Sequence, residues 1–99
     1  MKRQVEMQES MLRAHREFLT NLETSVTLME KELQDAAEMA TICTDEWCLS
    51  TEGMLDELSK IIFSISEPRW LGTEDSKRIS ALRHRAHDLY ARYKSVKKK

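Results

Sequence analysis

Turn-forming residues and cysteines are scarce in this chain, whose 99 residues include two glycines, one proline and two cysteines. An all-β fold needs frequent turns between short strands, so this scarcity argues against one. Cys43 and Cys48 match neither a C-x-x-C motif nor a zinc-ligand spacing, and we expect Cys43 to be a small core residue with a free thiol. The exposure of Cys48 is left open.

Segments that direct a protein to or across a membrane are also missing. No run approaches the roughly 18 consecutive apolar residues that span a bilayer, and no signal peptide is visible. Together with the reduced cysteines, this predicts an intracellular protein, cytoplasmic or associated with the cytoskeleton, without excluding the nucleus. The apolar pattern is already running at Val5 with no N-cap before it, which suggests a piece of a larger protein.

Charge is nearly balanced overall but unevenly spread. Residues 1–70 contain 7 basic and 14 acidic side chains, whereas residues 71–99 contain 9 basic and 3 acidic ones. A basic helix packed on acidic helices explains this asymmetry. The alternative is that the last helix and its lysine tail bind nucleic acid or an anionic membrane.

The chain is rich in a seven-residue apolar repeat, kept up for about five heptads. One row consists of Val5, Leu12, Leu19, Val26, Leu33, Ala40 and Trp47, and the next of Gln8, His15, Leu22, Met29, Ala36 and Cys43. Two such rows form the seam of a long helix whose apolar stripe other helices must cover.

Two further helices are expected after this one. The face predicted for the second consists of Trp47, Met54, Leu58, Ile61 and Ile65, and that for the third of Ile79, Leu82, Ala86, Leu89, Tyr93 and Val96. Pro68 ends the second helix, and Thr73 is a candidate N-cap for the third.

We therefore expect an all-α, antiparallel three-helix bundle that forms a single domain. Its helices should cover about 4–43, 46–66 and 74–97, with a loop at about 67–73. The first row also continues through Met54 to Ile61, so a second arrangement stays open. In that arrangement one helix runs to about residue 66, a return helix follows, and two chains dimerise into a four-helix coiled coil.

Charged residues flank the predicted seams at heptad intervals. They are Glu23, Glu30 and Glu32 in the first helix and Arg78, Arg85 and Arg92 in the third. We expect these side chains to pair across a shared interface and to specify which helices pack together.

No residue pattern in the sequence indicates catalysis or a cofactor. A Gly-rich phosphate loop and a Ser-His-Asp arrangement are both missing, so we expect no enzyme and no small-molecule substrate. His84 and His87 fall on the solvent side of the third helix without a third ligand, so we expect no metal site.

A working surface is expected instead where the first helix outruns the others. Forty helical residues span about 60 Å, whereas the third helix spans about 36 Å. The uncovered stripe would consist of Val5, Met11, Leu12, Phe18 and Leu19, and would meet a second copy or a helix of another protein. Trp70 and Leu71 either close the end of the bundle or anchor a partner.

The segments from Phe18 to Leu33 and from Ile79 to Tyr93 resemble the first and last helices of a spectrin-type repeat. The chain length is also similar to that family's three-helix unit. The resemblance implies a non-catalytic spacer or docking module in a cytoskeletal or signalling scaffold protein.

Overall fold

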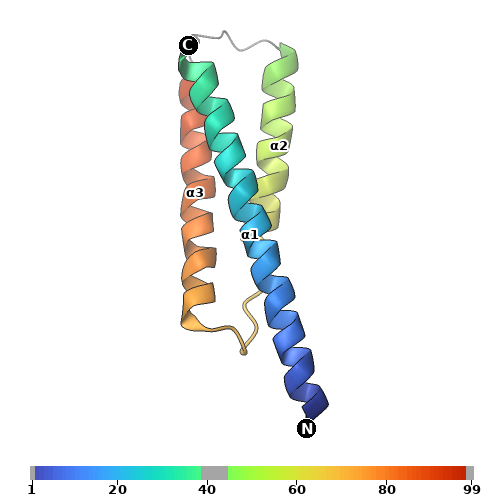
Figure 1. Ribbon diagram of the computed structural model, residues 1–99. Coiled ribbons are helices and arrows are strands. Elements are labelled where there is room, and N and C mark those ends of the chain that lie inside the picture. The colour runs from blue at the N-terminus through green and yellow to red at the C-terminus, as the bar shows by residue number, and fades with distance from the viewer. Residues whose placement is uncertain (1, 39–44, 98–99) are drawn as a thin grey trace.

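The computed structural model describes residues 2–38 and 45–97, which fold into three helices with no strand among them. α1 spans Lys2–Glu38, α2 spans Asp45–Phe63 and α3 spans Thr73–Lys97. α2 runs back beside the second half of α1, and α3 returns alongside both (Figure 1). The predicted all-α, antiparallel three-helix bundle is confirmed.

The alternative of one helix reaching to about residue 66 is wrong, because α1 and α2 are separate helices that pack on one another. The structure describes α1 as far as Glu38, so its expected end near residue 43 lies outside the described residues, and α2 begins at Asp45. The predicted core position of Cys43 lies outside the described residues.

The end of α2 and the start of α3 are fixed by local hydrogen bonds. The Ser64 amide donates to the Lys60 carbonyl at 3.1 Å, which closes the last turn of α2 before the expected end near residue 66. At α3, the Ser76 amide donates to the Gly72 carbonyl at 3.2 Å. Gly72 therefore occupies the N-cap position expected for Thr73, since its carbonyl accepts the first helical bond.

The core follows the predicted stripes of α1 and α3. Its members from these two helices are Leu19, Leu22, Val26, Met29, Leu33, Ile79, Leu82, Ala86, Leu89 and Tyr93, all buried. Their spacing by three and four places each on one side of its helix, so burying them holds α1 and α3 together.

The buried face of α2 agrees with the expected one at Trp47, Leu58 and Ile65, which pack against the core, but not at Met54 and Ile61. Leu55 and Ile62 are fully buried, whereas Met54 and Ile61, one position earlier in each case, are 63% and 41% exposed. α2 has two apolar rows, and because α2 is a separate helix that runs opposite to α1, the heptad phase of α1 does not carry over into it. The second row therefore faces solvent.

The first half of α1 continues beyond the bundle (Figure 1). We call Lys2–Phe18 of α1 the extension, because Leu19 is the first fully buried residue of this helix. The extension gives the molecule its elongated form, with principal dimensions of 59 × 22 × 18 Å. The structure thus contains the overhanging end that the difference in helix lengths predicts.

Candidate functional site

The extension exposes large apolar side chains to solvent. Met7, Met11 and Phe18 lie on one side of the helix, and Phe18, the least exposed of the three, is still 42% accessible. Val5 is exposed as well, and Leu12 is half-buried. Soluble surfaces rarely keep such a row uncovered, so the extension is the first candidate for a contact with another molecule.

Leu19 does not belong to this surface. Its side chain is fully buried among the core residues of the three helices. The prediction that Leu19 contacts a partner is therefore wrong, because α3 already covers α1 at this level.

The loop between α2 and α3 supports one side of the extension. Trp70 lines a small pocket of about 240 Å³ with Val5 and Leu12, and its ring meets His15 edge-on with centroids 6.1 Å apart. Leu71 packs against the core. Trp70 thus packs on the extension and Leu71 on the core, so neither loop residue is a free anchor in the structure.

A charged pair fixes the point where the extension leaves the bundle. The Arg16 guanidinium donates to both carboxylate oxygens of Asp75, at 3.1 and 3.2 Å. Asp75 is 2% exposed in the first turn of α3, and this bond from Arg16 lowers the pKa of its carboxyl group below the usual 3.8, against the effect of burial. The pair joins the start of α3 to α1 and orients the extension.

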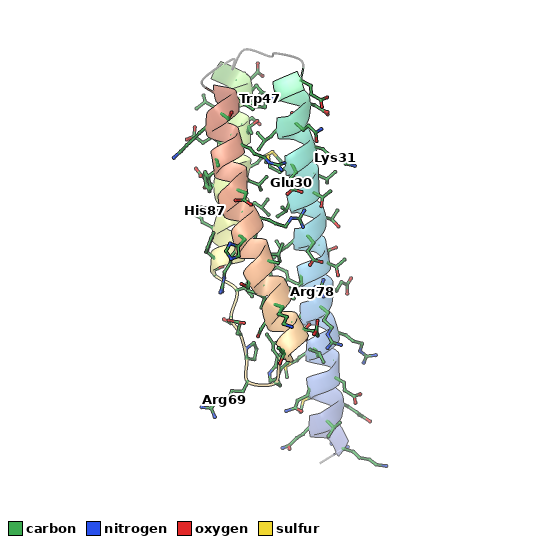
Figure 2. The ribbon with its side chains drawn as sticks, turned by 90° about the vertical axis from the view of Figure 1, so that its left-hand side faces the viewer. Glu30, Lys31, Trp47, Arg69, Arg78 and His87 are labelled. Carbon is green, nitrogen blue, oxygen red and sulfur yellow. The ribbon has the colours of Figure 1, made fainter. Side chains whose placement is uncertain are left out.

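Two identical polar clusters follow along the α1–α3 interface, one heptad apart. Arg78 donates to Glu23 at 2.7 Å and to the Thr20 hydroxyl at 3.0 Å. Arg85 repeats this contact with Glu30 at 2.7 Å and with Thr27 at 2.9 Å. Figure 2 shows Arg78 and Glu30 in the seam between the two helices.

These clusters fix which residues of α1 and α3 lie side by side. The bond to Glu23 also raises the pKa of Arg78, so the guanidinium stays charged. Each pair is about one-third exposed, which limits its stabilisation to about 1 kcal/mol at most.

The remaining predicted members of the charged interface, Glu32 and Arg92, are not brought together. Glu32 accepts a hydrogen bond from the Trp47 indole at 3.0 Å, which joins α1 to α2. Arg92 is exposed, and among the described residues it forms no ion pair. The next position in the glutamate series is Ala37, which lines a shallow hollow with Arg92, so the series ends there.

α2 is joined to α3 by the hydroxyl groups of two tyrosines, contacts that the sequence does not predict. The Tyr93 hydroxyl donates to the Cys48 carbonyl at 3.3 Å, and burial raises its pKa. The Tyr90 hydroxyl donates to Asp56, and this bond raises the pKa of Tyr90. Both phenols therefore stay neutral and act as structural donors across the α2–α3 interface.

The residues considered for metal or thiol chemistry lie apart. His84 and His87 are exposed, and His87 projects from α3 away from α1 (Figure 2). Within residues 2–38 and 45–97, no group of three or more His, Cys, Asp or Glu side chains is placed to hold a metal ion. Cys48 is buried and disulfide-bonded, so the expectation of reduced cysteines is wrong for this residue.

Comparisons with known proteins add no family. Scans of protein-family models, of curated proteins and of solved structures each return no match to this chain. None of the helices in the described part of the chain is both long and apolar enough to cross a membrane. The spectrin-repeat resemblance stays a prediction.

Proposed function

We propose that this chain is a non-catalytic protein–protein interaction module, a docking or spacer segment of the kind found in scaffold proteins. The observation that carries the proposal is the extension, a helix that leaves the bundle with Met7, Met11 and Phe18 uncovered on one side. Full burial of such side chains contributes about 1.5–3 kcal/mol each, so a helix or groove that covers them gains a stable contact.

Binding of nucleic acid or an anionic membrane through α3 has less support. Arg78 and Arg85 are held by glutamates of α1, and Arg83 donates to the Ile65 carbonyl at 3.3 Å. Three of the basic side chains of α3 are therefore engaged inside the bundle. This leaves Lys77, Arg92 and Lys94 as exposed cations on the described part of α3.

Site-specific photo-crosslinking in cells tests the proposal. A crosslinking amino acid replaces Met11 on the apolar side of the extension, and a matched chain carries it at Ser10, which is exposed about 100° around the helix from Met11. We expect Met11 to crosslink to a polypeptide and Ser10 to yield far less product. Replacing Met7 and Phe18 with glutamate should abolish the Met11 product.

The mass of the product separates a second copy from a different protein, and either result supports an interaction module. Equal crosslinking from Met11 and Ser10, or a Met11 product that survives the glutamate substitutions, would overturn the proposal.

A further inference from the structure

A second uncovered apolar surface lies between α1 and α2. It is a groove of about 600 Å³ whose apolar lining is Met29, Leu49, Met54, Leu58 and Ile61. Leu49 and Met54 are more than 60% exposed. We call this the α1–α2 groove.

A glycine in the α1–α2 groove points to an occupant that approaches the backbone closely. Gly53 lies in the interior of α2, where glycine is less favourable than alanine by about 1 kcal/mol. No atom lies within 4 Å of a Cβ placed there, so no contact within the described residues requires a glycine. A helix packed over Gly53 would require one, because its backbone could come near only where no side chain intervenes.

The extension has the shape and length to fill this groove. Its 17 residues, Lys2–Phe18, span about 25 Å, and the groove between Leu49 and Ile61 spans about 18 Å. Met11 and Phe18 are one heptad apart, as are Met54 and Ile61, so both pairs can meet in a single register.

The extension cannot reach the groove of its own chain. α1 is one uninterrupted helix from Lys2 to Glu38, and the groove lies beside its second half. Without a break in this helix, the first half cannot fold back on the second. The occupant must therefore come from another molecule.

Charge favours the same pairing. α2 has five acidic residues and one lysine, whereas the extension has four basic and three acidic residues. With Arg16 already paired with Asp75, the remaining charges of the extension balance, so the extension avoids the repulsion that opposes the pairing of acidic α2 with another α2.

We propose that the extension of a second copy docks in the α1–α2 groove, so that two copies exchange their extensions about a two-fold axis. Each three-helix bundle then gains a fourth helix, and one closed dimer covers both uncovered surfaces. The two α1 helices run antiparallel, and Met11 of one copy lies over Met54 of the other. This inference rests on the proposed function and adds the partner and its position.

Sedimentation equilibrium of the full chain from low micromolar to several hundred micromolar tests the dimer. Met54→Glu places a charge in the groove, and Met11→Glu places one on the extension; each should weaken the dimer at least about 100-fold. Both residues are exposed in the single chain, so both variants should keep their helicity. Phe63→Glu, on the side of α2 that faces α3, and Ser10→Glu are matched controls that should change the dissociation constant less than about threefold.

Gly53→Gln should change the thermal midpoint of the chain and the affinity of the dimer in opposite directions. Glutamine is a better helix former than glycine and meets open space, so the thermal midpoint of the dilute chain should rise. The same side chain blocks close approach, so the dimer should weaken about tenfold or more. A variant that misfolds would instead lower both the thermal midpoint and the affinity of the dimer.

Mixing the two defective variants is the decisive step. Met11→Glu retains an intact groove and Met54→Glu an intact extension, so an equimolar mixture should form a heterodimer through one docked extension while each alone stays monomeric. A mixture that stays monomeric while the wild type dimerises would overturn docking in the groove, as would a dimer unaffected by Met54→Glu.

The outcomes also separate the two proposals. A wild-type chain that is monomeric at every concentration refutes the second copy as partner, while a Met11 crosslink to another protein would still uphold the interaction module. A dimer that persists with Met11→Glu refutes the extension as its contact surface.

Discussion

Alanine substitutions at two consecutive residues of α2 should have very different effects on the stability of the protein. Leu55 is fully buried and Met54 is 63% exposed, although they are consecutive in one helix. Leu55→Ala leaves a cavity in the core and should lower the free energy of unfolding by about 2–5 kcal/mol. Met54→Ala removes an exposed side chain and should change it by less than about 0.5 kcal/mol.

The effect of Leu55→Ala is large for a domain of this size. Domains of about 100 residues have a free energy of unfolding of about 5–15 kcal/mol, and a loss of 1 kcal/mol lowers the thermal midpoint by about 4–8 °C. We therefore expect Leu55→Ala to lower the midpoint by more than about 10 °C. Alanine is the replacement in both variants, so helix propensity contributes little to the difference.

Urea denaturation followed by circular dichroism at 222 nm measures both free energies. The protein is kept dilute, because a dimer that covers Met54 would add its own association energy. Equal slopes against urea in all variants confirm that the same transition is compared. A loss with Met54→Ala as large as that with Leu55→Ala would refute the assigned core face of α2.

The charged contacts yield three further predictions. A double-mutant cycle on Glu23 and Arg78 should give a coupling of about 0.5–1 kcal/mol that decreases in 1 M salt, and a salt-independent coupling would contradict an ionic origin. Arg92→Ala should change stability by less than about 0.5 kcal/mol, since this side chain is exposed and unpaired among the described residues. The pKa of Asp75 is lowered in the folded state, so its carboxylate contributes fully to the free energy of unfolding above pH 3.8. This contribution is lost as the pH falls below that value, because the unfolded chain takes up the proton first. Asp75→Asn should therefore destabilise the protein by about 1 kcal/mol at neutral pH, discounted for the half-exposed Arg16, and should flatten the acid limb of a pH titration of stability.

The bundle and its α1–α3 interface could be predicted because both depend on spacing within long, unbroken helices. Every apolar position predicted for α3, from Ile79 to Val96, is buried. The contacts of Arg78 with Glu23 and of Arg85 with Glu30 follow from the same repeat, since parallel helices keep their register over several turns.

The orientation of α2 could not be obtained in this way. Met54 and Leu55 belong to apolar rows with the same heptad period, and the period alone does not say which row faces inward. That choice depends on how α2 is rotated about its own axis against α1 and α3, which the repeat does not encode. The sequence does not predict the groove for the same reason, because the heptad row places Met54 and Ile61 in the core.

Two side-chain contacts that lie outside the heptad pattern could not be predicted from the sequence either. The bond from the Trp47 indole to Glu32 joins two helices through a pair that no heptad rule favours. The bidentate contact of Arg16 with Asp75 likewise depends on where α3 begins relative to α1. A single sequence contains no signal for either contact, because both arise from the packed geometry of the helices.

The extension also bears on how the chain exchanges its amide hydrogens. A helix of fewer than about 15 residues is marginal in water by itself, but the first half of α1 grows from a turn that the bundle already holds, so no nucleation step is needed. Fraying from Lys2 should therefore stop near Arg16, where the bond to Asp75 begins to protect the backbone. Amide protection would then rise steeply across one or two helical turns, and any molecule that covers Met7 and Met11 would move that boundary toward the N-terminus.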